Sequence, residues 1–402
     1  MLKNIAYTSI KDISLNIQYG YTGKTIDNGK VKYLRITDIQ NNSVNWENVP
    51  FVAINNDEIE KYELHEKDIV FARTGATAGK SYLIEEIQVK SVFASYLIRI
   101  IPNQTKINPN YLYLYFQSPE YWKHIKGNVE GAAQPNFNGQ KLSKIKVPLV
   151  EITEQTRIVN KLNALFSCID KSITLLEENI KYSQALKSSI IENTFIKLIN
   201  HSKTLRIKEI AEIKGGKRLP KGETVLDKKT DYPYIRVTDF NDNGSIDLEN
   251  LKYLNKEVQE QIKRYIITSK DLYISIAGTI GKTGIIPKEL DNANLTENAA
   301  RLVFKSNLKI NNRFIYYFTL SNNFKEQVGM ATKTVAQPKL ALTRLAEVEI
   351  PIPSIEMQDK EVKEFDLISF KTNEILKYQQ SKLTYLKALK ASILDKAFKG
   401  EL

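Results

Sequence analysis

Two glycine-rich segments contain the residues of this chain that come nearest to a catalytic motif. They run from Gly75 to Ser81 (GATAGKS) and from Gly278 to Thr283 (GTIGKT). A phosphate-binding P-loop needs four residues between its glycines, because its backbone N–H groups cradle the phosphates only at that spacing. The first segment has three such residues and the second has two. We therefore interpret both as tight glycine turns that present a lysine and hydroxyl groups.

The remaining reactive residue types do not form a catalytic or metal-binding pattern. The three histidines, His65, His124 and His201, are scattered and lack metal-ligand spacing. Cys168 is the only cysteine, and its helical apolar surroundings predict a small core residue. Neither a carboxylate–lysine nuclease motif nor a glycine-rich loop for S-adenosylmethionine is present. We predict a protein that binds and does not catalyse, with no metal of its own.

The charge balance indicates what kind of partner is bound. Lys and Arg number 58 against 46 Asp and Glu, which gives a net charge of +12 and favours a polyanionic partner. With a single cysteine the chain has no internal disulfide, so we expect a reducing, cytoplasmic location. The sequence contains no run of 18 apolar residues, so no membrane span is predicted.

The chain consists of two related halves. Residues 133–135 (AQP) recur as residues 336–338 at an offset of 203, and residues 33–38 (YLRITD) recur as residues 234–239 (YIRVTD) at an offset of 201. Small loop insertions account for the drift in offset. A duplicated chain predicts a pseudo-two-fold molecule with two similar but non-identical faces.

Each half begins with a region of mixed secondary structure, residues 1–150 and residues 201–353. Short β-rich runs alternate there with turns of Gly, Asn and Asp, and one shorter helical stretch is predicted near 110–125 and near 312–328. We therefore predict two α+β globular domains.

A long helix follows each mixed region, at residues 151–200 and 354–402, because apolar residues recur there at steps of three and four. We predict that the two helices pack as an antiparallel coiled coil and join the pseudo-two-fold-related domains. A helix of about 45 residues would span roughly 65 Å. The first seam comprises Ile158, Leu162, Leu165, Ile169, Ile173, Leu176 and Ile180, and the second comprises Val362, Phe365, Ile368, Leu376, Leu383, Leu386, Leu389 and Ile393.

The motif order resembles that of the specificity subunits of type I restriction–modification systems, over nearly the whole chain. One departure is the short N-terminus, with only residues 1–9 before the first domain begins. Similar segments also stand at residues 215–220 (GGKRLP) and 396–402 (KAFKGEL). The hallmark residues are Gln134, Pro135, Asn136, Phe137, Leu142, Ile145, Pro148, Gln155 and Ile158, which recur as Gln337, Pro338, Lys339, Leu340, Leu345, Val348, Pro351, Pro353, Gln358 and Val362.

This resemblance implies a DNA-recognition subunit without catalysis. Each target-recognition domain would read one half of a bipartite, asymmetric site in double-stranded DNA. The helices would set the spacing and dock two modification subunits, which methylate adenine using S-adenosylmethionine. Two restriction subunits, which use ATP and Mg²⁺, can join such complexes. The chain itself would bind no cofactor.

Candidate DNA contacts are the polar residues of the predicted turns and strand ends. Bases are read by Arg, Lys, Asn or Gln, and phosphates by cations, hydroxyls and backbone N–H groups. Arg35 and Arg236 have an alternative role, because each precedes Thr-Asp and could pair with Asp38 or Asp239. The first-half candidates are Lys24, Arg35, Thr37, Arg73, Thr74, Thr77, Lys80, Ser81, Asn136 and Asn138. The second-half candidates are Lys217, Arg218, Lys221, Arg236, Thr238, Thr279, Lys282, Thr283, Lys333 and Lys339.

The long helices also carry apolar residues outside their seams. We predict that these face the modification subunits; they are Leu175, Tyr182, Phe195, Leu367, Phe370 and Tyr385.

Two other functions remain open on the sequence. A self-contained methyltransferase or nuclease is disfavoured by the missing cofactor loop and carboxylates. A protein scaffold that binds no nucleic acid is disfavoured, more weakly, by the net charge of +12 and by the Gly-Lys turns.

Overall fold

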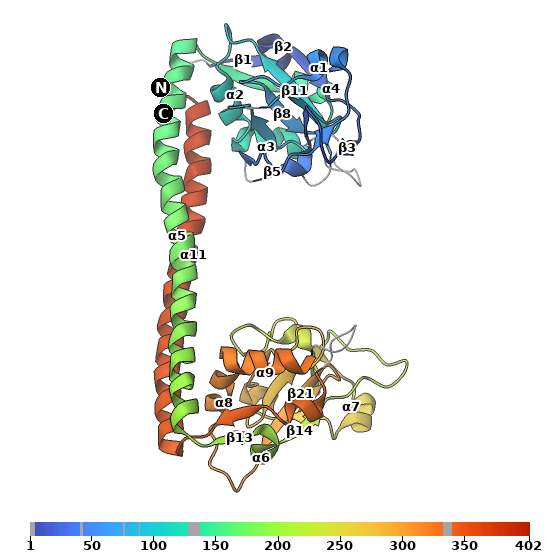
Figure 1. Ribbon diagram of the computed structural model, residues 1–402, viewed down its shortest axis with the longest axis vertical. Coiled ribbons are helices and arrows are strands. Elements are labelled where there is room, and N and C mark those ends of the chain that lie inside the picture. The colour runs from blue at the N-terminus through green and yellow to red at the C-terminus, as the bar shows by residue number, and fades with distance from the viewer. Residues whose placement is uncertain (1–4, 41–42, 75–76, 88, 128–136, 333–339) are drawn as a thin grey trace. The chain divides into compact units, whose positions relative to one another are not determined.

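The chain forms two compact units. The first unit contains Met1–Glu177 and Ser381–Leu402, and the second contains Glu178–Gln380. Each consists of one α+β domain and a segment of both long helices, α5 (Ile152–His201) and α11 (Ile355–Phe398) (Figure 1). The computed structural model describes residues 5–40, 43–74, 77–87, 89–127, 137–332 and 340–402.

The segments of α5 and α11 run antiparallel within each unit. In the first unit, Asp170 of α5 pairs with Lys390 of α11 at 2.7 Å, and Arg157, near the start of α5, donates to the carbonyl of Leu402 at 3.1 Å. In the second unit the rings of Phe195 and Phe365 lie 5.6 Å apart. The predicted antiparallel pairing is confirmed.

The seam differs from the prediction at one position of the first helix. Leu165 is 38% exposed, whereas Phe166 is buried and lies under the ammonium group of Lys390 at 4.8 Å. Ile158, Leu162 and Ile169 are buried as expected. The inward stripe therefore steps by four, four and three residues from Ile158, which keeps the larger aromatic ring against α11.

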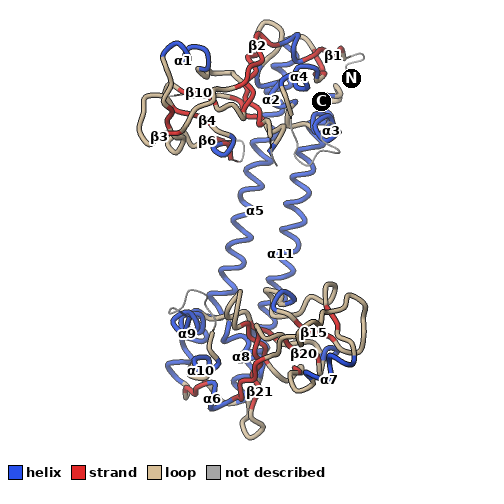
Figure 2. The backbone as a smooth tube through the Cα atoms, turned by 90° about the vertical axis from the view of Figure 1, so that its right-hand side faces the viewer, coloured by secondary structure: helices blue, strands red, loops and turns tan. Residues whose placement is uncertain are grey.

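The domain of the first unit is built on two four-stranded sheets (Figure 2). The first is wholly antiparallel and has the order β2-β11-β8-β9, and the second has the order β10-β4-β7-β3 with β10 and β4 parallel. Two strand pairs complete the domain, β1 with β12 and β5 with β6. The strands are β1 (Ala6–Ser9), β2 (Ser14–Tyr19), β3 (Thr25–Ile26), β4 (Lys32–Leu34), β5 (Ile39–Gln40), β6 (Ser43–Val44), β7 (Phe51–Val52), β8 (Ile69–Ala72), β9 (Ser81–Leu83), β10 (Ser91–Phe93), β11 (Leu97–Pro102) and β12 (Lys146–Leu149).

The domain of the second unit repeats the antiparallel sheet and the central strands of the second sheet, whose outer strand differs. Its antiparallel sheet has the order β14-β21-β18-β19, its second sheet has the order β16-β15-β20-β17 with β15 and β20 parallel, and β13 pairs with β22. The strands are β13 (Thr204–Arg206), β14 (Ala211–Gly215), β15 (Pro233–Ile235), β16 (Lys252–Tyr253), β17 (Ile266–Ile267), β18 (Leu272–Ser275), β19 (Thr283–Gly284), β20 (Ala293–Leu295), β21 (Ala299–Phe304) and β22 (Glu349–Pro351).

The helical stretch predicted in each domain is divided into two helices. Ser118 precedes Pro119, which disfavours a continuing helix, and the Ser118 hydroxyl then accepts from the backbone N–H of Tyr121 at 3.2 Å. Ser321 caps the equivalent helix by accepting from Phe324 N–H at 3.2 Å. The helices are α1 (Asn56–Tyr62), α2 (Pro109–Tyr115), α3 (Pro119–Gly127) and α4 (Gly139–Lys144), then α6 (Ile207–Ile210), α7 (Lys256–Ile262), α8 (Asn312–Thr319), α9 (Asn322–Thr332) and α10 (Leu342–Leu345). Single 3₁₀ turns are η1 (Ile10–Ile13), η2 (Ile36–Asp38), η4 (Val237–Asp239) and η5 (Lys288–Leu290).

Aromatic residues anchor the C-terminal ends of the long helices to the domain cores. Phe398 packs against Tyr111 and Tyr115, with ring centroids 5.1 and 5.3 Å away. Phe195 packs against Phe314 and Phe318 at 5.2 and 5.3 Å. Phe195 is fully buried, so the prediction that it faces a partner subunit is wrong. Its ring fills the second core as Phe398 fills the first.

A buried glutamine ties the start of each long helix to its domain. The side-chain oxygen of Gln155 accepts from the Asn108 N–H at 2.7 Å, and its amide donates to the carbonyls of Lys106 and Val150. Gln358 makes the equivalent bonds in the second unit, accepting from the Asn311 N–H at 2.9 Å. Both glutamines belong to the duplicated hallmark, and the structure gives them a structural role.

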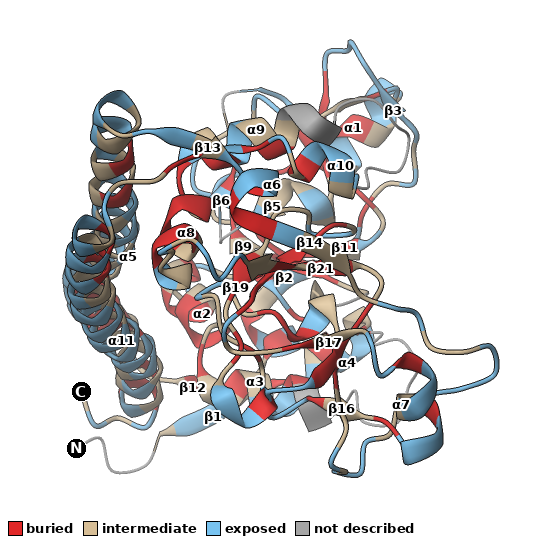
Figure 3. Cartoon of the chain, turned by 90° about the horizontal axis from the view of Figure 1, so that it is seen from below, coloured by how far each residue is buried: buried red, intermediate tan, exposed pale blue. Residues whose placement is uncertain are grey.

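Burial follows the strands and the domain-facing sides of the helices (Figure 3). Cys168 is exposed on α5, which corrects the prediction of a core residue. It is adjacent to the seam residue Ile169 and so points away from the packed face. Among the residues that the structure describes, no helix is both long enough and apolar enough to cross a membrane.

Candidate nucleic-acid interface

The structure gathers four of the predicted contact residues into one groove of the second unit. This groove, which we call the arginine groove, has a volume of about 610 Å³. Its lining includes Arg218, Lys221, Arg236 and Thr238, together with Glu297, which the sequence analysis did not single out. Three cations and a hydroxyl in one open depression match the chemistry of a DNA backbone and of base edges.

Arg236 is held by a neighbouring carboxylate at the edge of the arginine groove. Its Nη2 and Nε atoms donate to the two oxygens of Asp239 at 2.6 and 3.2 Å, and its backbone N–H donates to the same carboxylate at 2.8 Å. Asp239 is only 2% exposed. Arg236 therefore adopts its alternative role in the free chain, which is to pair with Asp239.

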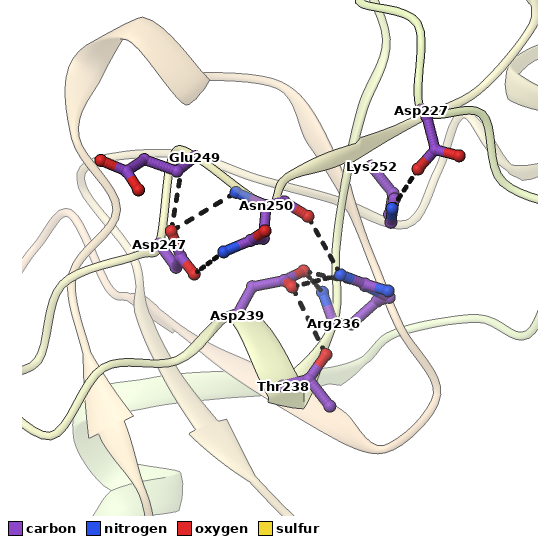
Figure 4. A network of polar contacts seen from close by, with 8 residues as sticks. All are labelled: Asp227, Arg236, Thr238, Asp239, Asp247, Glu249, Asn250 and Lys252. Atoms are coloured by element: carbon purple, nitrogen blue, oxygen red, sulfur yellow. Dashed lines mark hydrogen bonds and ion pairs between the residues drawn. The ribbon is translucent and has the colours of Figure 1, made fainter. Parts of the chain in front are cut away.

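Figure 4 shows the wider network around this pair. Arg236 also donates to the carbonyl of Asn250 at 3.2 Å, and the Asn250 side chain donates to Asp247 at 2.8 Å. Lys252 pairs with Asp227 nearby. Thr238 is exposed, because the pair fixes the 3₁₀ turn that carries it. The arginine thus positions a hydroxyl at the edge of the groove.

The first unit repeats this arrangement. Arg35 donates from Nη2 to Asp38 at 2.7 Å and from Nε at 3.0 Å, and the hydrogen bond to that carboxylate raises the pKa of Arg35. Thr37 is exposed on the same turn. Lys24 is exposed as well, on the loop before β3.

A glycine junction in each unit sets the backbone next to these turns. Gly216 donates its N–H to Ala299 at 2.9 Å, and Gly20 donates to Leu97 at 3.2 Å. A Cβ at Gly216 would collide with the carbonyl oxygen of Thr296, and one at Gly20 with that of Ala94. Only glycine permits this close approach of two backbone segments.

The Gly-Lys turns place their lysines at the surface and their final hydroxyls in the core. Lys80 is exposed, and Lys282 pairs with Asp242 at 2.9 Å. Ser81 and Thr283 are 7% and 5% exposed, because each begins or joins a β-strand, and the Thr283 hydroxyl lies 2.5 Å from that of Thr319. This burial counts against the prediction that Ser81 and Thr283 contact DNA and assigns them to packing.

The other turn residues lie near the surface. Thr77 and Thr74 are half-buried, and Thr279 is exposed between Gly278 and Gly281, which have φ angles of +76° and +85°. These left-handed conformations are the reason for glycine in the second turn.

Arg73 and Asn138 line a different groove of the first unit, with a volume of about 790 Å³. The Arg73 guanidinium lies 5.1 Å from the ring centre of Tyr19, and the Asn138 side chain accepts from the N–H of Lys141 at 2.8 Å. Asn138 is thus the N-cap of α4. The first-unit candidates are therefore spread over several surfaces, whereas those of the second unit converge more strongly.

Lys217 and Arg218 are exposed just beyond the second glycine junction. The Lys217 ammonium lies 5.6 Å from the ring centre of Tyr265, and Arg218 pairs with Glu297 at 2.7 Å. Asn136, Lys333 and Lys339 lie outside the described residues. Glu297 could have been found by aligning the two halves around the glycine junction, where Ser95 occupies its place.

The described part of the chain holds no group of three or more His, Cys, Asp or Glu side chains that could bind a metal ion. The burial of Tyr121 raises its pKa well above the usual value, and its hydroxyl donates to the carbonyl of Gly79 at 2.7 Å. This buried tyrosine supports the first Gly-Lys turn from below and is not available as an acid or base.

A duplicated α+β domain, paired long helices and cations in grooves are the features expected of a two-domain DNA-recognition protein. A family model for the type I restriction modification DNA specificity domain matches residues 7–181 and again residues 200–385. The chain belongs to this family. The resemblance stated from the motifs is confirmed, as is the α+β fold with long antiparallel helices.

Similar proteins agree with this assignment. The type I restriction enzyme EcoBI specificity subunit of Escherichia coli is 27% identical over 316 residues, which cover 73% of this chain and 66% of that protein. The MjaVIII specificity subunit of Methanocaldococcus jannaschii is 26% identical over 326 residues, covering 77% and 73%. This chain thus spans slightly less than two thirds of the length of the first of these relatives.

Two solved structures share the fold. A chain from a study of complex assembly and conformational transition of the type I restriction–modification system gives a TM-score of 0.78 at 18% identity, covering 99% of this chain and 98% of that one. The HsdS subunit from Thermoanaerobacter tengcongensis gives a TM-score of 0.54 at 18% identity, covering 99% and 97%.

Proposed function

We propose that this chain is the DNA-recognition subunit of a type I restriction–modification complex, in which each unit reads one half of a bipartite, asymmetric site in double-stranded DNA. The observation that supports this proposal is that both units have the same backbone framework but carry different side chains on it. Gly20 and Gly216 form equivalent junctions, and Arg35 and Arg236 support equivalent turns. One fold that offers two different surfaces suits two different half-sites.

In this proposal the chain performs no chemistry itself. Two methyltransferase subunits bind S-adenosylmethionine and methylate adenine, and two restriction subunits, where they join, use ATP and Mg²⁺. The net charge of +12 and the lack of a metal-ligand cluster among the described side chains support a binding role. The lone, exposed Cys168 is consistent with a cytoplasmic location.

The long helices are the proposed docking surface for the methyltransferase subunits. Large apolar side chains are exposed along them, with Tyr385 65% exposed in the first unit and Tyr182, Phe370 and Tyr378 between 66% and 69% exposed in the second. Exposed aromatic side chains are typical of protein–protein interfaces. Because the chain is duplicated, we expect one methyltransferase per unit and two per chain.

Co-expression with the cognate methyltransferase, followed by sequencing of methylated adenines in the host genome, tests the proposal. We expect methylation at a single bipartite motif, and none when either protein is expressed alone. Methyl transfer by the purified chain alone would show a self-contained enzyme. Equal gel-shift affinity of the co-purified complex for the motif and for random duplex would show that the chain does not recognise sequence.

The stoichiometry is tested separately by light scattering of the co-purified complex. Two methyltransferase chains per copy of this chain are expected. A stable one-to-one complex at saturating partner would contradict docking on both units.

A further inference from the structure

The two glycine junctions allow the units to be compared residue by residue. Lys217 N–H donates to Leu295 at 2.8 Å, and Tyr21 N–H donates to Phe93 at 2.8 Å. The hydroxyls of Tyr234 and Tyr33 then donate to the carbonyls of Lys217 and Tyr21, at 3.1 and 2.8 Å. Because these bonds match, the residue that follows Lys217 occupies a position equivalent to the residue that follows Tyr21.

Two surface positions follow from this match. Arg218 in the second unit corresponds to Thr22 in the first, and Glu297 corresponds to Ser95. The backbone hydrogen bonds of Tyr21 and Lys217 match, but the first unit has Thr22 and Ser95 where the second unit has the ion pair of Arg218 with Glu297. A difference confined to side chains on a shared framework is what distinct half-sites require.

The Arg218–Glu297 pair leaves most of the arginine available. Nε of Arg218 donates to Glu297 at 2.7 Å, and the arginine side chain is 80% exposed. Nε of the guanidinium is therefore held, and the high exposure of the side chain leaves its two terminal amino groups accessible. Two such groups match the O6 and N7 acceptors of guanine in the major groove.

Glu297 is itself fixed and charged. The Thr296 hydroxyl donates to its second oxygen at 2.9 Å. Partial burial tends to raise the pKa of Glu297, but hydrogen bonds from Arg218, from Thr296 and from its own backbone amide outweigh burial and leave the pKa below its usual value. An ionised carboxylate in the arginine groove would repel DNA phosphates. Glu297 therefore does not raise the affinity for DNA, and its presence is better explained by its orienting Arg218.

The other arginine of the groove is less suited to reading a base. Arg236 has both of its carboxylate-facing nitrogens bonded to Asp239 and shares Nη2 with the Asn250 carbonyl. Its side chain is 30% exposed. Of the two arginines that line the arginine groove, Arg218 is the more exposed and has fewer hydrogen bonds to the protein.

We propose that Arg218 reads a guanine in the half-site of the second unit, with Glu297 as the positioning residue that aims its guanidinium. The first unit, with Thr22 and Ser95 at these places, reads its own half-site without this contact. The inference rests on the proposed function, because it assumes that the second unit recognises a DNA half-site.

The test uses the complex of the full chain with its methyltransferase, once the methylated motif is known. In Arg218→Lys the charge stays but the fork is lost. We expect the preference for guanine at one position of one half-site to fall by about tenfold to a hundredfold, with the salt dependence of binding unchanged. Glu297→Gln should relax the same position by a smaller factor and no other.

Lys221→Ala is the matched control, because Lys221 is an exposed cation of the same groove. It should weaken binding to all sequences equally and lower the salt slope by about one. The same behaviour for Arg218→Ala, with specificity intact at every position, would reduce Arg218 to a phosphate contact and overturn the inference.

A transplant into the first unit adds a gain-of-function arm. The double variant Thr22→Arg, Ser95→Glu should change the base preference at one position of the other half-site only. If this variant and Arg218→Lys both keep the base preferences of the unmodified complex at every position, the inference is refuted, although sequence recognition itself stands. Loss of all sequence preference in the unmodified complex would instead refute the proposed function. Circular dichroism of each variant confirms that these exposed changes leave the fold intact.

Discussion

The first and second units have the same strand order in their antiparallel sheets and the same helix anchors, yet they use charge differently. In the second unit, Lys282 is paired with Asp242 and Arg218 with Glu297. In the first unit, Lys80 is exposed at the position equivalent to Lys282, and a hydroxyl replaces Arg218. Duplication therefore preserved the internal hydrogen bonds and varied the surface. The internal bonds hold both copies to one backbone, which leaves the groove side chains free to differ.

The largest expected effect concerns the aromatic anchors. Phe398→Ala should lower the free energy of unfolding of the first unit by about 3–5 kcal/mol, because it leaves a cavity beside Tyr111 and Tyr115. Both tryptophans, Trp46 and Trp122, belong to the first unit, so their fluorescence during urea titration reports this loss.

Phe195→Ala should cost as much in the second unit, measured by circular dichroism, and leave the tryptophan transition in place. A tryptophan transition that shifts equally in both variants would mean that the two units unfold as one block.

A buried ion pair sharpens the comparison. Arg99 and Asp68 are 5% and 4% exposed, and Arg99 also bonds to Gln18 at 2.6 Å. Arg99→Met should destabilise the first unit by about 3 kcal/mol or more, since it leaves a buried charge unpaired. The equivalent Arg301 is 13% exposed and pairs with Asp271 at 2.7 Å. Arg301→Met should therefore lower the free energy of unfolding of the second unit by less. Equal losses would contradict this ranking.

The same variant has a pH signature. Burial already raises the pKa of Asp68 in the folded chain, and removal of Arg99 should raise it further. A folded pKa above the unfolded value means that the folded state takes up the proton first. The loss caused by Arg99→Met should therefore shrink as pH falls through the folded pKa of Asp68, because protonation removes the unpaired buried charge. A loss that does not shrink on acidification would contradict this account.

The glutamine ties should matter equally in the two units. Gln155→Leu and Gln358→Leu each leave a buried N–H and buried carbonyls without partners, at a cost of about 1–3 kcal/mol in the free energy of unfolding. Gln184→Leu, on the exposed side of α5, is the control and should change stability by less than about 0.5 kcal/mol. If either glutamine variant loses no more stability than Gln184→Leu, the hydrogen bonds of that glutamine do not stabilise the fold.

The smallest expected effect is on the salt dependence of DNA binding. Lys80→Ala should reduce the slope of log K against log salt by about one, because its ammonium is exposed and forms no ion pair with a described residue. Lys282→Ala should reduce it by less, since Asp242 already balances that charge. Gel shifts at several salt concentrations measure both slopes, and a larger change for Lys282→Ala would reverse the comparison.

Several features could be predicted from particular residues. The apolar steps after Pro148 and Pro353 predicted two long helices, observed as Ile152–His201 and Ile355–Phe398. The Arg-x-Thr-Asp spacing at Arg35 and Arg236 predicted the local ion pairs. Such features depend on neighbours a few residues away, and local spacing reports them directly.

Three residues that local pattern placed wrongly or missed depend on distant neighbours. Phe195 looked like a partner contact because its apolar position lies outside the helix seam, yet Phe314 and Phe318 enclose it. Ser81 looked like part of an exposed turn, but a strand buries it. Glu297 had no local signal, since its importance comes from Arg218, which lies 79 residues earlier in the chain.

By itself, the sequence determined the family, the duplication, the long helices and the basic charge, because repeats, periodicity and composition are properties of the chain as written. Only the tertiary structure decided which polar residues share a groove and which are buried. That choice rests on where Gly20 and Gly216 let two backbone segments touch, and on which side chains the resulting packing leaves at the surface. These are contacts between residues far apart in the sequence, and no local pattern specifies them.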